Sequence, residues 1–250
     1  MSRRAVRAAA VAYGALTHAA FAAAIACMAW ALYHGLHGGP FDARGARPSL
    51  ALALPVDALL IAQFPLLHSW LLGARGRALL ARAFPAPHGA QLATTTFALV
   101  ASLQLLLVFG AWIPLGPELA RASGGWLGAS QVAYAASFAL LAKAIHDAGM
   151  GLQTGYIGWS AVAAGRKPRY PAMPSGGLFR ACRQPIYLGF ALTLWTGPVI
   201  SVDRLALALP WTAYCVFGPR LKERRFARWY GAAWSDYRAR TPYMLPVRWP

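Results

Sequence analysis

The stretch from Ala8 to Leu32 reads AAAVAYGALTHAAFAAAIACMAWAL and holds no charged residue over 25 positions. A helix of that length exceeds the roughly 20 residues that cross the ~30 Å hydrocarbon layer of a bilayer. It also exceeds the apolar core of a removable signal peptide, which is about 7 to 15 residues long. The stretch therefore predicts a first transmembrane helix that stays in the protein.

Apolar runs dominate the rest of the chain. Of its 250 residues, 58% are hydrophobic and 12% are charged, against roughly 25% charged in a soluble domain. The sequence predicts an all-α integral membrane protein with about six transmembrane helices. The last two runs would cover only about 26 and 21 Å, so we expect them to form a tight helical hairpin around 201–203. The six runs are Ala8–Leu32, Leu50–Leu72, Leu92–Ile113, Trp126–Ile145, Ile186–Val202 and Leu205–Gly218.

Basic residues between the runs predict the orientation. With six crossings, 19 Lys and Arg residues fall on one side, and four fall on the other, namely Arg44, Arg47, Arg121 and Arg204. Because Lys and Arg accumulate in cytoplasmic loops, both termini are expected in the cytoplasm of a bacterial-type inner membrane. Within a single membrane domain, 1–250, we expect four spans in 1–145, a cytoplasmic cofactor-site segment at 146–184, the hairpin at 185–218 and a cytoplasmic tail at 219–250.

Several classes of function are excluded. A formal net charge of +17 would suggest nucleic-acid binding in a soluble protein, but here the basic residues flank apolar runs, so we expect a lipid bilayer and no nucleic acid. The three cysteines are scattered and predict neither a disulfide framework nor a metal site. Since no glycine-rich motif follows a strand, any cofactor must bind to helices and loops.

Polar side chains inside the second apolar run mark a candidate site, because an ionisable group in a membrane costs ~2.5 to 3.5 kcal/mol. Asp57 and His68 are eleven residues apart and share a helix face, while Gln63 lies between them on another face. His68 either lines a cavity or packs with a satisfied ring N–H.

A second polar stripe ends the fourth run. Lys143, His146 and Asp147 are spaced i, i+3, i+4 and so lie on one helix face. The simplest interpretation is that Lys143 pairs with Asp147. His146 remains open to the same two interpretations as His68.

The most informative stretch is GLFRACRQPIYLG at 177–189, which leads directly into the hairpin. Arg183, Gln184, Pro185 and Tyr187 gather polar and aromatic groups at a helix start. Proline suits the first turn of a helix, and Arg183 and Tyr187 are spaced i, i+4 and can share a face. After the hairpin, Glu223 stands among basic residues, so we expect it to be ionised and paired.

At these residues the sequence resembles the membrane-embedded, S-adenosylmethionine-dependent methyltransferases related to isoprenylcysteine carboxyl methyltransferase. That family carries a G-x-[YF]-R-x-x-R-H-P-x-Y-x-G motif, and then an E-E pair before G-x-x-[YW]-x-x-Y. Here the second part appears as Lys222-Glu223 and GAAWSDY at 231–237. The string QFPLLHS at 63–69, together with His146, is most similar to the bacterial methanethiol S-methyltransferase branch.

The resemblance implies a site for S-adenosylmethionine. Arg183, Gln184, Pro185, Tyr187 and Glu223 would bind this cofactor, since its sulfonium, amino-acid end and purine need an acid, a base and aromatic surface together. Glu223 would also act in catalysis. The implied acceptor is a small hydrophobic thiol, and no metal is implied.

The remaining site residues concern the acceptor. Arg220 and His146 would be catalytic, and Arg220, three residues from Glu223 and on the same helix face, could favour the thiolate electrostatically. Gln63 and His68 would bind the substrate.

Two positions depart from the family pattern. Gln184 replaces the motif histidine, and Lys222 replaces the first glutamate of the acidic pair. Glutamine forms hydrogen bonds but carries no proton or charge. Methylation of a lipid or isoprenoid-linked carboxylate therefore stays open as an alternative, as does a non-catalytic membrane protein that keeps the fold.

Overall fold

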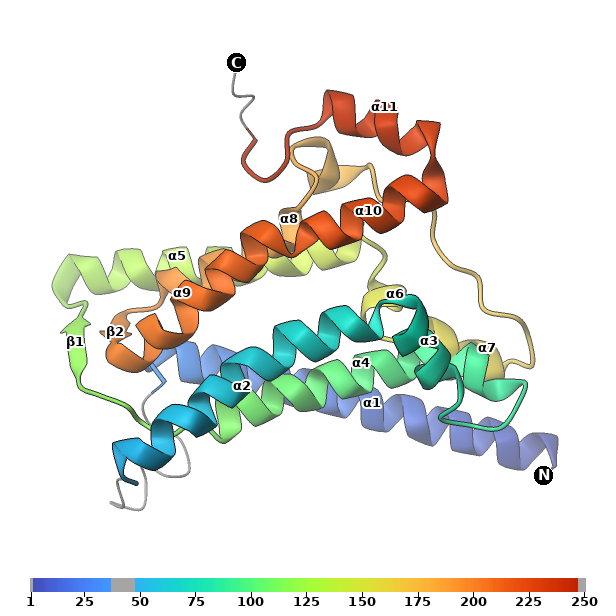
Figure 1. Cartoon of the computed structure of the whole chain (residues 1–250), viewed down its shortest axis with the longest axis horizontal. Coiled ribbons are helices and arrows are strands. Elements are labelled where there is room, and N and C mark those ends of the chain that lie inside the picture. The colour runs from blue at the N-terminus through green and yellow to red at the C-terminus, as the bar shows by residue number, and fades with distance from the viewer. Residues whose placement is uncertain (1, 37–47, 247–250) are drawn as a thin grey trace. The chain divides into compact units, whose positions relative to one another are not determined.

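The computed structural model of the chain describes residues 2–36 and 48–246. Within these ranges the chain is all-α apart from one pair of short strands (Figure 1). The elements in chain order are α1 (Arg3–Tyr33), α2 (Leu50–Leu71), α3 (Ala74–Ala81), α4 (His88–Gly110), β1 (Glu118–Arg121), α5 (Gly124–Asp147), α6 (Met150–Gln153), α7 (Tyr156–Ala163), the 3-10 helix η2 (Gly177–Arg180), α8 (Pro185–Thr196), β2 (Val199–Ser201), α9 (Val202–Phe217), α10 (Pro219–Tyr230) and α11 (Ala232–Arg240).

Three helices of the described ranges are long and apolar enough to cross a membrane, namely α1, α2 and α4. They coincide with the first three predicted spans and support the membrane class. The other three predicted spans fall on α5, α8 and α9, which have 24, 12 and 16 residues and lie outside that group. Arg44, Arg47 and Arg248, which enter the orientation argument, lie outside the described residues.

The chain forms two compact units. The first contains most of α1 together with α2, α3, α4, α6 and α7. Its core includes Ala10 of α1, Leu92 of α4 and Val162 of α7, all buried and in one cluster. The hydroxyl of Tyr13 donates to Thr96 Oγ1 at 3.1 Å and adds a polar link between α1 and α4.

The second unit contains α5, η2, α8 to α11 and the two strands. Helices α5 and α8 pack closely at Gly189, where an added Cβ would lie 2.9 Å from the Cα of Leu141. Helices α8 and α9 also pack against each other and are joined by β2. The short α8 thus leads straight from the motif segment into the packed part of this unit.

The connection between α8 and α9 is fixed by buried charge. Arg204 is 1% exposed, and its guanidinium donates to the carbonyl oxygens of Leu194, Gly197 and Val199 at 2.6 to 2.7 Å. Ser201 caps α9 by accepting from the Arg204 N–H at 2.9 Å. Because buried backbone oxygens must find donors, one arginine supplies the donors for three of them in this turn.

The two strands were not predicted from the sequence. β1 pairs with β2 in antiparallel register, Arg121 opposite Val199, with an irregularity between Glu118 and Ala120. Asp203 at the start of α9 adds to the connection by accepting from the Leu115 N–H at 2.6 Å. Segments of three and four residues carry too little alternation to stand out in sequence, so the pairing became visible only in the fold.

Candidate functional site

The motif segment 177–189 folds as a short 3-10 turn followed by the start of α8. Gln184 is the N-cap of α8. Pro185 is in the first turn of this helix, as the sequence predicted. Arg183 therefore lies before the helix, and it does not share a helical face with Tyr187. The reason is local, since a proline at the first helical position disfavours helical backbone for the residue preceding it.

Glu223 of α10 joins the two C-terminal motifs. Its Oε1 accepts from Arg183 Nε at 2.9 Å and from Gln184 Nε2 at 2.8 Å. The side chains of Arg183 and Glu223 are only 10% and 13% exposed. The prediction that Glu223 is paired is confirmed, and its partners are two of the residues expected to bind the cofactor.

Arg183 also holds the segment that follows α11. Its Nη1 donates to the carbonyl oxygens of Thr241 at 2.6 Å and Arg238 at 3.2 Å, and its backbone N–H donates to Pro242 at 2.9 Å. Its guanidinium carbon lies 5.4 Å from the centre of the Tyr243 ring. One arginine thus ties η2, α10 and the C-terminal segment together.

Lys222, which precedes Glu223 on α10, lies close to the same segments. Its Nζ lies 5.5 to 5.9 Å from the ring centres of Phe179, Tyr187 and Phe226, which we call the aromatic cage. It also lies 3.5 Å from the backbone oxygen of Arg183. We call Arg183, Gln184, Lys222 and Glu223 the motif cluster.

A hydrophobic core lies beside the motif cluster. Phe179, Trp234 and Tyr237 are buried with Ala148, and Phe226 packs against them. The hydroxyl of Tyr237 donates to the Phe179 oxygen at 2.7 Å. These contacts hold η2 against α10 and α11, so the polar groups above them have defined positions.

The motif cluster has the chemistry that S-adenosylmethionine needs. Gln184 is fully buried, and its Oε1 has no hydrogen-bond partner among the described residues. A buried unpaired oxygen costs about 1 to 3 kcal/mol, and a ligand N–H would offset that cost. The motif cluster also holds a carboxylate and a guanidinium, and three aromatic rings lie around Lys222. The residues present therefore fit a ligand that combines amine, carboxylate, sulfonium and purine.

Two predicted catalytic residues lie at the edge of the second unit. The exposed Arg220 places its guanidinium carbon 5.1 Å from the Phe217 ring centre. His146, at the end of α5, has a side chain that is 69% exposed, with Nδ1 3.4 Å from Asp147 Oδ1. The structure gives neither side chain a hydrogen bond to the motif cluster, so their catalytic roles stay predictions.

Asp147 links α5 to the start of the motif segment. It pairs with Lys143, as the sequence predicted, and its Oδ2 accepts from the Leu178 N–H at 2.8 Å. The Lys143 ammonium and the Leu178 N–H hold the pKa of this carboxyl low, at about 2. Asp147 therefore helps to fix where η2 begins.

Gln63 and His68, the predicted substrate residues, lie on α2 in the first unit. Gln63 and Gln104 of α4 hold each other through three hydrogen bonds of 2.7 to 3.1 Å. His68 packs between Phe64 and Phe97, with ring centres 5.0 and 4.9 Å away. Asp57 is buried and accepts from the Ile113 N–H at 3.1 Å. These contacts serve packing between α2 and its neighbours, and the substrate roles stay predictions.

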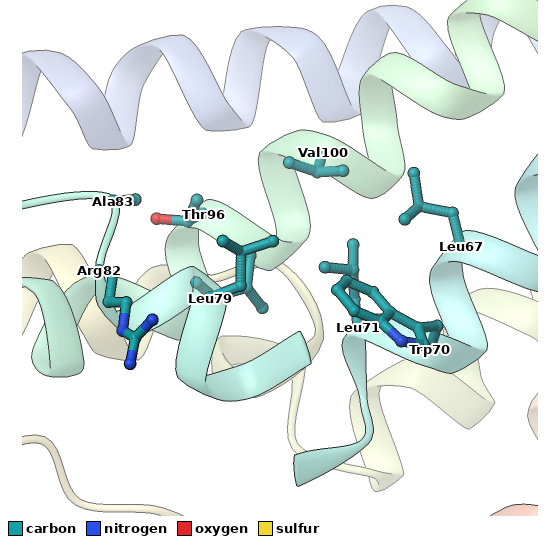
Figure 2. Close-up of a pocket in the computed structure, with 9 residues that line it drawn as sticks. Leu67, Trp70, Leu71, Leu79, Arg82, Ala83, Thr96 and Val100 are labelled. Atoms are coloured by element: carbon teal, nitrogen blue, oxygen red, sulfur yellow. The ribbon is translucent and has the colours of Figure 1, made fainter. Parts of the chain in front are cut away.

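An apolar hollow of about 380 Å³ lies in the first unit between α2, α3 and α4. Figure 2 shows Leu67, Trp70 and Leu71 from α2 with Leu79 from α3 and Val100 from α4. Neither of the predicted substrate residues lines it.

Sequence reasoning missed the aromatic cage and the role of Lys222 in it. One signal was present, because Lys222 and Phe226 are spaced i, i+4 on a helix. Phe179 and Tyr187 come from segments about 40 residues away, and only the fold brings them to the lysine.

Comparisons with known proteins agree with the resemblance. The chain is 28% identical over 207 residues to methanethiol S-methyltransferase 2 of Bradyrhizobium diazoefficiens, covering 81% of this chain and 76% of the relative. It is 27% identical over 210 residues to methanethiol S-methyltransferase of Crocosphaera subtropica, covering 80% and 78%. The protein of that name from Mycobacterium tuberculosis is 27% identical over 62% of this chain and 64% of its own length.

The other two comparisons give no match. No family model matches the chain, and no solved structure does. The wider relation to isoprenylcysteine carboxyl methyltransferase therefore stays a prediction. The resemblance to the methanethiol branch is confirmed, because over about four fifths of its length the chain is similar to curated proteins named methanethiol S-methyltransferase.

Proposed function

We propose that this protein is an integral-membrane methyltransferase that transfers a methyl group from S-adenosylmethionine to a small hydrophobic thiol such as methanethiol. The observation that carries the proposal is the junction at Glu223, where the two C-terminal motifs meet through Arg183 and Gln184. The methyl acceptor is inferred from the names of the similar proteins.

The motif cluster supplies groups of the right type for the cofactor. When bound, S-adenosylmethionine supplies an activated methyl group on a sulfonium sulfur. Glu223 provides a negative charge, Gln184 provides a free acceptor oxygen, and Arg183 provides a fixed guanidinium. Because these groups are largely screened from water, their charges act more strongly than they would at the surface.

Methyl transfer to a thiolate brings opposite charges together, so a dry and well-positioned site accelerates it. The thiol itself is a poor nucleophile, and the protein must favour its ionised form. We propose that Arg220 contributes a positive charge to this step and that His146 acts beside it. Gln63 and His68 are proposed to contact the apolar acceptor.

We also propose the finer topology. In this topology α5 and a hairpin of α8 and α9 also cross the membrane, in addition to α1, α2 and α4. These six crossings place 19 basic residues on the cytoplasmic side. The motif cluster then lies at the cytoplasmic surface, where a soluble cofactor can reach it. An acceptor that partitions into lipid would enter from the membrane.

Titration of the purified full-length protein with S-adenosylmethionine tests the proposal, followed by assay of methanethiol as acceptor. Binding together with thiol methylation supports it. Binding with methylation of only lipid or isoprenoid carboxylates would exclude the thiol assignment and favour that alternative. Absence of both would favour the non-catalytic alternative, to which Gln184 and Lys222 point.

His146→Ala and Arg220→Ala test the two edge residues. Each is expected to lower kcat more than it lowers cofactor affinity, because neither side chain has a hydrogen bond to the motif cluster. A loss of cofactor affinity as large as the loss of kcat would assign these two residues to cofactor binding instead.

A further inference from the structure

Lys222 has surroundings unlike those of the other two lysines of the chain. Lys143 pairs with Asp147 at the end of α5, and Lys167 is exposed. Lys222 is half-buried, and its Nζ lies among the three rings of the aromatic cage. Its hydrogen bond to the Arg183 oxygen is long, at 3.5 Å. An amine held this way has exchanged much of its hydration for one weak acceptor and three cation–π contacts.

The charged and titratable groups that face this amine come from three segments. Glu223 and Arg225 belong to α10, Arg183 and the Cys182 thiol precede α8, and the Tyr187 phenol belongs to α8. Burial lowers the pKa of Lys222 to about 8, and the positive charges of Arg225 and Arg183 act in the same direction. Glu223 and Cys182 oppose this shift without reversing it. An ordinary lysine amine keeps its proton up to about pH 10.4.

The neighbouring groups are poorly suited to accept a proton. Arg183 does not lose its charge in proteins, and the Glu223 carboxylate is already paired with Arg183 and Gln184. Cys182 is buried, and burial raises the pKa of its thiol. In the motif cluster, the group that can be neutral near physiological pH and still bind a proton is the amine of Lys222.

We propose that Lys222 accepts the proton of the thiol that is methylated. This deepens the proposed function and rests on it. The thiol S–H bond breaks with its proton passing to the neutral Nζ, and the sulfur bonds to the methyl carbon as the carbon–sulfonium bond breaks. The sulfonium positive charge is lost, the ammonium of Lys222 gains one, and this proton then leaves to water.

A cation bound beside Lys222 reinforces this role. A positive sulfonium in the motif cluster disfavours a second positive charge, so it favours the neutral, proton-accepting amine. The substitution of lysine for the glutamate of the acidic pair is then a change in how the thiolate is made. On this account it need not mark a lost activity.

The first test reads the ionisation of Lys222 without relying on turnover. The purified full-length protein in lipid nanodiscs is labelled with trace acetic anhydride over a range of pH, and modified lysines are quantified by peptide mass spectrometry. Lys222 is expected to titrate near pH 8, well below the roughly pH 10.4 of an ordinary lysine amine. A Lys222 titration at about pH 10.4, the ordinary lysine value, would overturn the proposal.

The second test uses Lys222→Met, which keeps side-chain length without an amine, with Lys167→Met as the matched control. At pH 7.5 the single-turnover rate with methanethiol should fall roughly 100-fold or more, the usual share of a general base. The wild-type rate should rise with pH and level off above about pH 8. The Lys222→Met rate should continue to rise, because the thiol must then ionise unaided.

Lys222→Arg separates charge from proton transfer. It keeps a cation in the aromatic cage but cannot accept a proton, so it should be as slow as Lys222→Met while remaining folded. Full activity in Lys222→Arg would show a structural role for Lys222 and overturn the proposal. So would a single-turnover rate of Lys222→Met that depends on pH in the same way as the wild-type rate. Failure of the wild type to bind S-adenosylmethionine would instead overturn the proposed function, and calorimetry detects that separately.

Discussion

Replacing Glu223 by glutamine tests the junction on which the site is built. Glu223 Oε1 accepts two hydrogen bonds, one of them from a guanidinium, and both partner side chains are mostly buried. Glutamine keeps an oxygen that can accept one bond, but it removes the charge. We therefore expect the loss of about one charge-assisted hydrogen bond, which is about 1.5 to 3 kcal/mol.

That free energy corresponds to roughly 10- to 150-fold weaker binding of S-adenosylmethionine. Isothermal titration calorimetry on purified wild type and Glu223→Gln measures it directly. Asp236→Asn is the matched control, because Asp236 is an exposed acid on α11 and its change alters the net charge equally. Unchanged cofactor affinity in a folded Glu223→Gln variant would refute the assignment of the motif cluster as the cofactor site.

Three further perturbations test other parts of the structure. Reporter fusions at Arg75 and Arg169 should both give cytoplasmic signals, and a periplasmic signal at either would overturn the orientation. Gly177→Ala should destabilise the protein by about 1 to 3 kcal/mol, because its φ is +57° and the new Cβ would clash with Asp147, whereas Gly176→Ala meets nothing and should leave thermal unfolding unchanged. The pKa of Asp147 is about 2 in the folded state and about 3.9 when unfolded. The contribution of Asp147 to the free energy of unfolding is therefore full above pH 4 and is lost as pH falls towards 2. The thermal unfolding curves of wild type and Asp147→Asn should accordingly differ at pH 6 and converge near pH 2, and a constant difference would exclude this linkage.

Apolar length predicted the three long helices of the first unit, α1, α2 and α4, but not its short helices α3, α6 and α7. The run Leu50–Leu72 corresponds to α2 at Leu50–Leu71, and Ala8–Leu32 lies within α1. Composition is sufficient here, because each of these segments must bury its backbone within itself to cross lipid. The strands β1 and β2 have no such signature, since three or four residues pair only where the fold brings them together.

The candidate site could be predicted in part. Local motifs marked Glu223 and its neighbours, and local rules placed Pro185 at the helix start. The partners of Glu223 lie about 40 residues away, and the pairing with Arg183 was visible only once both segments were in place. Lys222 looked like a departure from a family pattern. Its significance depends on three aromatic rings, and the i, i+4 spacing in the sequence points only to Phe226, whereas Phe179 and Tyr187 reach the lysine only in the fold.

One measurement addresses the proposed activity most directly. Purified protein in lipid nanodiscs is incubated with methyl-labelled S-adenosylmethionine and methanethiol, and the volatile product is analysed by gas chromatography with mass spectrometry. We expect labelled dimethyl sulfide from the wild type and a large loss of it in Glu223→Gln. A protein that is folded and saturated with S-adenosylmethionine but forms no labelled dimethyl sulfide would contradict thiol methylation.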